Sequence, residues 1–365
     1  MTDLPKVLDD PLVGELARLG VGYDDAPGYP VDSIAVLARS GLLRRFAPVA
    51  SGGDKFGDPV ERHYAMLDAL RRVGRGDLSV GRLFEGHVNA LALFDWYATA
   101  DQNAWLRELL DQDAVFGVWA TQPAPGVTLI EDDDGARLQG AKSFASGAGG
   151  IDFAIVTVRP ADGTRRLAIV AANETERTDA SGWRVRGMRA SMSGTYDLTG
   201  YRIDDPALLG APGDYDREPR FTAGAWRFTA VQLGGIEALL AETRAMLSDA
   251  ARADALSRAA LGHAIVATRT AWLWVREAAL RAGREDADAA AFVRITRGVV
   301  ERAALDVMEH AARLVGTRSA FTEQRVDKIT RDLSLYLRQA GPDQVRDTAV
   351  RDWIEHDCWG EDPLW

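Results

Sequence analysis

The sequence predicts an α+β protein of several domains: an N-terminal α-helical domain, a central antiparallel β-barrel domain and a C-terminal bundle of long helices. Three observations support this fold class. Apolar residues recur at helical spacing up to residue 114, short β-rich runs separated by Gly, Asp and Pro fill residues 115–210, and long Ala-, Leu- and Arg-rich segments follow over 211–365. A length of 365 residues also exceeds that of one small module. We therefore expect domains over 1–114, 115–210 and 211–365.

The N-terminal region is predicted to be helical from its apolar spacing. Within residues 59–73, large apolar side chains recur every three residues, which places them on one face of a helix. Asp77 has the residue type and position of a helix N-cap. It predicts a second helix that runs through Leu91.

The central region has the composition of short strands. Its β-rich runs are separated by turn-forming residues and cover residues 115–119, 127–130, 153–158, 167–170 and 196–203. The triplet Asp133-Asp134-Gly135 is typical of a hairpin turn. Runs of this length and spacing favour a small antiparallel sheet domain of the barrel type.

Three long helices are expected in the C-terminal region, over residues 223–247, 259–281 and 287–315. They contain few helix breakers, and Gly316 stands where the third should end. Helices of this length pack as an antiparallel bundle. No Gly-rich strand-turn-helix unit of the Rossmann type occurs, so a nucleotide would have to bind by another route.

Charge and composition argue against several classes of partner and site. A net charge of −11 repels polyanions, so neither nucleic acid nor an anionic membrane is the expected partner. The five histidines form no HxxxH pair and the single cysteine, Cys358, cannot build a thiolate cage, so no metal site is expected. No apolar run approaches the roughly 20 residues of a membrane span. The first residues carry no export signal, so we expect a cytoplasmic protein without membrane insertion.

Five short motifs follow one another along the chain: GLL…AP…GG (41–53), TQP (121–123), GAKSFASG (140–147), GMRAS (187–191) and RD (331–332). Each motif alone is weak, but their order spans all three regions. The series resembles the acyl-CoA dehydrogenase superfamily over essentially the whole chain. This resemblance implies a flavoprotein with FAD as cofactor, or FMN in its place.

The resemblance implies four residues around the flavin ring. Trp119, Thr121, Phe144 and Ser146 would line it, with Thr121 and Ser146 near N5 and Phe144 over one ring face. These residue types suit a flat, largely apolar ring with a polar edge. The alternative for Trp119 and Phe144 is an ordinary position in the sheet core.

The cofactor tail is bound in this superfamily across a subunit interface by the long C-terminal helices, which implies a homodimer or homotetramer. Here the sequence departs from the family pattern, because Ala312 and Val315 stand where a Gln-x-x-Gly-Gly motif is usual. Thr317 and Arg318 could donate to the pyrophosphate instead. Alternatively, both are ordinary solvated loop residues.

The usual catalytic base of the family is missing. Desaturation of an acyl thioester needs a carboxylate within hydrogen-bond reach of the proton that is removed. In the family this glutamate most often stands eight residues after the Asp of the RD pair, where this sequence has Ala340, and in a minority of members at the position of Ala225. Unless Glu323, Asp343 or Glu237 reaches the site, classical desaturation should fail.

A second branch of the superfamily uses reduced flavin and O2 to hydroxylate aromatic, heterocyclic or amino-sugar substrates. The segment 144–148 is similar to that branch, and His87 falls where some members carry an active-site histidine. Gln339 replaces a second histidine, and Ser146 is a further catalytic candidate. For His87 the alternative is a buried histidine with satisfied hydrogen bonds, and for Ser146 a flavin-edge contact without catalytic duty.

By the same resemblance, Arg227, Arg338 and Gln339 face the substrate cavity. An arginine there would favour an anionic or carbonyl-bearing substrate. The alternative is that Arg227 and Arg338 cap helices or pair with nearby acids.

Three functions follow from these expectations. The first is an FAD-dependent oxidoreductase of the acyl-CoA dehydrogenase type, acting on an acyl thioester or related small molecule and passing electrons to an acceptor flavoprotein. The second is a monooxygenase that depends on reduced flavin, O2 and a flavin reductase. The third is a flavin-free binding or assembly protein. The sequence leaves the substrate open.

Overall fold

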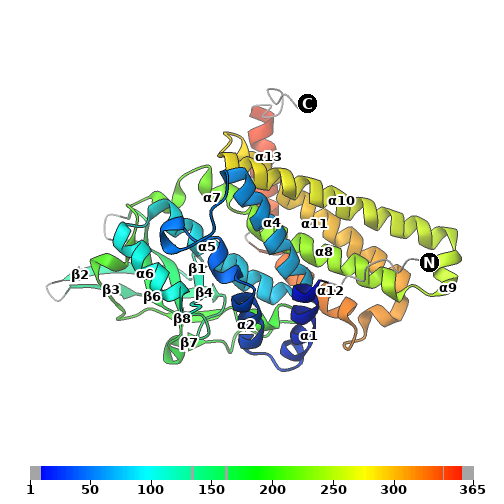
Figure 1. The fold of residues 1–365 in the computed structure, drawn as a ribbon, viewed down its shortest axis with the longest axis horizontal. Coiled ribbons are helices and arrows are strands. Elements are labelled where there is room, and N and C mark those ends of the chain that lie inside the picture. Colours follow the sequence, from blue (N-terminus) through cyan, green and yellow to red (C-terminus); the bar gives the residue numbers. More distant parts are fainter. Residues whose placement is uncertain (1–9, 133–134, 161–162, 340, 356–365) are drawn as a thin grey trace.

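The computed structural model describes residues 10–132, 135–160, 163–339 and 341–355 (Figure 1). Cys358, Ala340 and the predicted turn residues Asp133 and Asp134 lie outside this part of the chain. The described residues form a helix-rich fold with small sheets gathered at one end and long helices at the other. No helix among them is long and apolar enough to cross a membrane.

The helices α4 (Pro59–Gly76) and α5 (Leu78–Tyr97) both begin at capping aspartates, of which the sequence analysis had named Asp77. The Asp58 carboxylate accepts a hydrogen bond from the backbone N–H of Glu61, and Asp77 accepts one from Val80 at 3.0 Å, so each caps the helix that follows. The predicted helices are therefore confirmed. The N-terminal helices are α1 (Pro11–Asp25), α2 (Val31–Arg39), α3 (Leu42–Arg45), α4 (Pro59–Gly76), α5 (Leu78–Tyr97) and α6 (Ala100–Leu110).

Ten short strands follow in the described part of the chain, arranged as three small sheets with the orders β1-β5-β6-β10, β2-β3-β9 and β4-β8-β7. The pairings among the described strands give three separate sheets and do not show the closed barrel that was expected. The strands are β1 (Phe116–Trp119), β2 (Thr128–Asp132), β3 (Gly135–Gln139), β4 (Ala141–Ala145), β5 (Phe153–Val158), β6 (Arg166–Ala171), β7 (Thr178–Asp179), β8 (Gly194–Asp197), β9 (Arg202–Ile203) and β10 (Leu208–Leu209).

One strand pair differs from the expected antiparallel arrangement, because β1 pairs with β5 in parallel. Phe116 lies opposite Phe153 in this register, with the two rings stacked at 5.5 Å. Helix α5 packs on β1 and buries it. A parallel pair between buried strands is therefore stabilised by aromatic packing beneath a helix.

The C-terminal region contains the three long helices that were expected, now α8, α10 and α11, and Gly316 ends α11 with a φ of 68°. The 3-10 helix η7 (Gly316–Ala320) follows directly. The C-terminal helices are α7 (Arg220–Ala223), α8 (Trp226–Met246), α9 (Asp249–Ala253), α10 (Ala255–Arg284), α11 (Ala289–Val315), α12 (Arg325–Tyr336) and α13 (Pro342–Glu355).

Helices from both ends of the sequence form one bundle, in which α4 packs on α8 and α10 (Figure 1). Glycines allow the close approach: a Cβ at Gly74 would meet the carbonyl oxygen of Val231 at 2.3 Å, and one at Gly234 would meet that of Arg71 at 2.1 Å. The division into three domains at residues 114 and 210 thus stays a prediction, since the first and third segments share a core.

Two of the sequence motifs meet at α12. The carboxylate of Asp332 accepts a hydrogen bond from the backbone N–H of Met188 at 2.5 Å and one from Lys328 at 2.7 Å. A Cβ at Gly187 would meet the carbonyl oxygen of Arg331 at 2.2 Å, so only glycine fits against α12 there. The GMRAS and RD motifs therefore join the sheet region to the bundle.

Candidate functional site

Phe144 and Thr121 form an open face at the edge of the sheet region. Phe144 lies in β4, yet its ring is 63% exposed and its φ is 51°, a left-handed conformation that costs energy for a bulky residue. The exposed Thr121 follows β1, and its carbonyl oxygen accepts a hydrogen bond from the N–H of Ser143 at 3.1 Å. An exposed aromatic residue and an exposed threonine thus belong to adjoining segments of the surface, and a flat apolar ligand with a polar edge needs these two residue types.

Trp119 lies in the sheet core. It is 2% exposed, its ring contacts that of Tyr196 at 5.1 Å, and its indole N–H donates to the carbonyl oxygen of Ser146 at 3.1 Å. Ser146 in turn shares a hydrogen bond with the hydroxyl of Ser193 at 2.8 Å. These contacts leave neither side chain directed into an open slot.

The space beside Trp119 and Ser146 has a volume of only about 10 Å³. That is room for about one water molecule. Arg82, Leu83 and Ile151 fill the rest of this region. This space is therefore too small for a flavin ring, whereas Thr121 and Phe144 are exposed at the surface.

A buried chain of polar side chains runs from this space through α5 to α8. Arg82 binds the carboxylate of Glu85, Asn89 donates to the other oxygen of Glu85, and Arg227 donates through Nε to the amide oxygen of Asn89. Burial, the largest influence, opposes the charge on Arg82, but Glu85 together with Tyr336 and Tyr215 raises the pKa of Arg82 above its usual value. Arg227 has no such partner, and burial lowers its pKa to about 10.

His87 is completely buried, and both of its ring nitrogens have backbone partners. Nδ1 accepts a hydrogen bond from the N–H of Phe116 at 3.0 Å, which leaves Nε2 to donate to the carbonyl oxygen of Leu43 at 2.6 Å. Burial lowers its pKa to about 4. The geometry matches a histidine that joins α3, α5 and β1 in a single neutral tautomer, and it leaves no nitrogen for a substrate.

The candidate residues near the end of α12 lie apart from the open face. Arg338 is largely exposed and reaches toward Glu301 on α11 at 3.7 Å, while the carbonyl oxygen of Gln339 accepts a hydrogen bond from Arg297 at 3.0 Å. The side-chain oxygen of Gln339 is buried without a hydrogen-bond partner. Thr317 and Arg318 lie exposed on η7. No described contact brings these four residues to Thr121 or Phe144.

No carboxylate among the described residues takes the place of the missing base. Ala225 stands at the start of α8, and Glu237 is paired with Arg71 at 3.0 Å. Asp343 is almost fully exposed beside Arg346, and Glu323 is exposed. The one charged side chain among the described residues that line the space beside Trp119 is Arg82.

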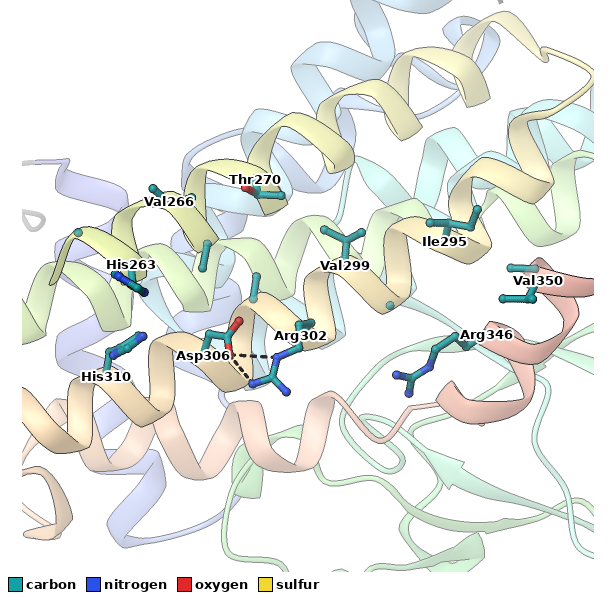
Figure 2. Close-up of a pocket in the computed structure, with 15 residues that line it drawn as sticks. His263, Val266, Thr270, Ile295, Val299, Arg302, Asp306, His310, Arg346 and Val350 are labelled. Carbon is teal, nitrogen blue, oxygen red and sulfur yellow. Dashed lines mark hydrogen bonds and ion pairs between the residues drawn. The ribbon is translucent and has the colours of Figure 1, made fainter. Parts of the chain in front are cut away.

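Two larger hollows lie elsewhere. An open groove of about 850 Å³ follows α10, α11 and α13, with His263 and His310 facing each other at one end and Arg302 paired with Asp306 at 3.0 Å (Figure 2). A cavity of about 620 Å³ lies between the start of α4, the end of α5, α7 and the end of α10, and Arg227 lines it.

The sequence analysis missed Arg82, Glu85 and Asn89. A signal was present, because these residues stand three and four positions apart in a helix that is otherwise mainly apolar. This spacing indicates one polar stripe on a buried helix, but it does not indicate that Arg227 on α8 is its partner.

Sequence comparison finds a relative among known enzymes. No family profile matches the sequence. The chain is 30% identical over 209 residues to a dibenzothiophene monooxygenase from Mycolicibacterium goodii, and the match covers 53% of this chain and 48% of that protein. The chain thus spans about half the length of the curated relatives that it matches.

Structural similarity extends over nearly the whole chain. The complex of TdsC from Paenibacillus sp. A11-2 with FMN and indole has a TM-score of 0.82 at 21% identity and covers 95% of this chain and 96% of that one. Butyryl-CoA dehydrogenase from Megasphaera elsdenii has a TM-score of 0.79 at 18% identity, covering 97% and 100%. Solved structures from both branches of one superfamily therefore share this fold.

Proposed function

We propose that this chain, which has the acyl-CoA dehydrogenase fold, is a flavin-dependent oxidoreductase that works as a monooxygenase with reduced flavin and O2. The observation that carries the proposal is the match, at 30% identity, to a dibenzothiophene monooxygenase. The proposed substrate class is a small aromatic or heterocyclic molecule, because that relative is a dibenzothiophene monooxygenase and the TdsC complex contains indole.

The missing base supports monooxygenation over desaturation. Removal of a proton from the α-carbon of an acyl thioester requires a nearby carboxylate. Ala225 cannot supply one, and Glu237, one of the alternatives that the sequence offered, is held by Arg71 on another helix. Transfer of an oxygen atom from reduced flavin and O2 requires hydrogen-bond donors and the exclusion of water, but no such carboxylate.

The flavin is proposed to lie on the open face of Thr121 and Phe144. The Phe144 ring would cover one face of the isoalloxazine, and the Thr121 hydroxyl would donate to its polar edge. Bound there, reduced flavin supplies the electrons that activate O2. FAD and FMN share this ring, so the proposal includes both.

Dehydrogenation of an acyl thioester with FAD is the second candidate, favoured by the whole-chain likeness to butyryl-CoA dehydrogenase. A flavin-free binding protein is the third, favoured by the small space beside Trp119. Each predicts a different outcome in the experiment below.

Partners follow from the proposed chemistry. A flavin reductase would supply the reduced cofactor to a monooxygenase, and an acceptor flavoprotein would serve a dehydrogenase. We propose a homodimer or homotetramer formed through the groove of α10 and α11, where Val266 is 66% exposed beside Ala267 and Val299. The expected location stays the cytoplasm.

The test is oxygen transfer. The purified chain is incubated under 18O2 with FMN or FAD, NADH, a flavin reductase and catalase, and with indole or dibenzothiophene as substrate. The proposal predicts product that carries 18O and forms only when chain, flavin and reductase are all present. Bleaching of bound FAD by acyl-CoA thioesters without 18O product would support the dehydrogenase. A chain that neither binds flavin nor catalyses either reaction would support the flavin-free protein.

A further inference from the structure

The cavity of about 620 Å³ that Arg227 lines is separate from the open face of Thr121 and Phe144. Its wall includes the apolar side chains of Phe56, Trp96 and Ala223. In Figure 1 the elements that form it meet at the end of the bundle where α4, α7 and α10 come together. Its volume is within the range of small-molecule sites.

Most charged side chains around this cavity are already paired. Arg62 binds Asp95 at 2.8 Å, Arg220 binds Glu285 at 2.9 Å, and Arg284 binds Asp286 at 2.9 Å. The two remaining acids of the lining also have partners, since Asp58 caps α4 and Asp54 lies 3.4 Å from Arg45. Three of the four acids of the lining are therefore paired with an arginine, and the fourth, Asp58, is held by a backbone N–H at the positive end of α4.

Arg227 is the exception. It is 7% exposed, and no carboxylate among the described residues lies within ion-pair distance of it. Its described hydrogen bond runs from Nε to Asn89, which occupies only one nitrogen of the guanidinium. Nη2 lies beside Gly224, itself part of the cavity wall, because a Cβ there would be 2.7 Å from this atom.

The polar chain behind Arg227 carries one excess positive charge. It contains two guanidinium groups, on Arg82 and Arg227, but a single carboxylate, on Glu85, which Arg82 binds directly. A buried charge without a partner destabilises the folded protein. The excess charge stands at the cavity end, so an anion in the cavity would stabilise it.

We propose that this cavity binds a small organic carboxylate, with its charged group on the Nη atoms of Arg227 and its apolar body against Phe56 and Trp96. One uncompensated positive charge is neutralised by a monoanion, whereas a phosphate dianion would leave a net negative charge buried beside it. Guanidinium nitrogens and a carboxylate form strong, charge-assisted hydrogen bonds.

The site is distinct from the proposed flavin position. Neither Thr121 nor Phe144 belongs to the wall of this cavity. Carboxylate binding is therefore measurable on protein without flavin, and its failure leaves the proposed monooxygenase activity untouched.

Benzoate and benzamide test the inference, because they share shape and size but differ in charge. Binding is measured by isothermal titration calorimetry and by the rise in Tm, on the full-length chain without added flavin. We expect benzoate to bind the wild type, benzamide to bind at least tenfold more weakly, and Arg227→Gln to weaken benzoate binding by about 10- to 100-fold. Arg227→Lys should keep part of the affinity.

Arg284→Gln is the matched control, since it removes a lining arginine that is already paired with an acid. It should bind benzoate like the wild type. A soak of wild-type crystals with 4-bromobenzoate removes any dependence on the folding of the variants, with the bromine expected in the cavity beside Arg227. Equal binding of benzamide, unchanged binding by Arg227→Gln, or bromine absent from the cavity would each overturn the proposal.

Discussion

His87 shows, at the scale of one residue, how burial fixes a protonation state. From the sequence alone, this histidine could have either a catalytic or a structural role. Both ring nitrogens are hydrogen-bonded to the backbone, and this geometry matches the structural role. Burial lowers the pKa of both His87 and His63 to about 4 from 6.5. As the pH falls from 6.5 to 4, the unfolded chain takes up these protons first, so the free energy of unfolding falls.

The variant His87→Gln tests this linkage. At pH 7 it should lower the free energy of unfolding by about 1–3 kcal/mol, because the N–H of Phe116 loses its acceptor. Between pH 7 and pH 5 the variant should lose about 2 kcal/mol less than the wild type does. Urea denaturation at both pH values measures the difference. Equal losses in the two proteins would show that His87 is not buried in the neutral form.

Phe144 combines an unfavourable backbone with an exposed ring, and its ring contact among the described residues is an edge contact with Trp183 at 6.5 Å. Phe144→Asn should leave the free energy of unfolding unchanged or raise it by up to about 1 kcal/mol, because asparagine tolerates the left-handed region. The same change should weaken flavin binding at least tenfold by removing the proposed cover of the ring. Fluorescence titration with FMN and urea denaturation measure the two effects. Unchanged flavin affinity would remove Phe144 from the site.

Helix α12 depends on one buried carboxylate. Asp332 binds both the N–H of Met188 and the ammonium of Lys328, which Asp77 also binds at 2.7 Å. Asp332→Ala should therefore cost about 3–5 kcal/mol of unfolding free energy, since it leaves buried donors without acceptors. Asp327→Ala on the same helix, where the carboxylate pairs with the partly exposed Arg331, should cost at most about 1 kcal/mol. Similar losses in thermal denaturation would contradict the assignment.

At the scale of elements, helices were more predictable than strand pairing. Helical periodicity and caps such as Asp58 and Asp77 are local, so the sequence located α4, α5 and the three long helices. The parallel pairing of β1 with β5 depends on residues that are distant along the chain, and local composition carries no information on it. The link from Arg227 to Asn89, 138 residues apart, was invisible for the same reason.

The whole molecule leaves one face of its bundle exposed. The groove along α10, α11 and α13 is lined mainly by small and apolar residues, which is typical of a surface that another chain covers (Figure 2). Val266→Asp in this groove should shift the protein toward the monomer, whereas Val49→Asp, at a similarly exposed valine outside it, should not. Light scattering coupled to size-exclusion chromatography measures the mass. A wild type that is monomeric, or an unchanged oligomer in Val266→Asp, would contradict this interface.

The motif order resembles that of the acyl-CoA dehydrogenase superfamily, and the structure shares the fold of butyryl-CoA dehydrogenase. The site was less predictable, because the resemblance assigns positions along strands without saying which side chains face outward. Trp119 and Thr121 are two residues apart near the end of β1, yet one is buried and the other exposed. Only the packing of Tyr196 and Ile151 around Trp119 and Ser146 shows that the space there is small.

Retention of flavin by the purified chain tests the central claim most directly. The protein is incubated with excess FMN or FAD, passed through a desalting column, and its visible absorbance is compared with its concentration, alongside Phe144→Asn. The account predicts that the wild type elutes yellow, with close to one flavin per chain, and that the variant elutes with much less. A wild type that elutes colourless after incubation with either flavin would contradict it.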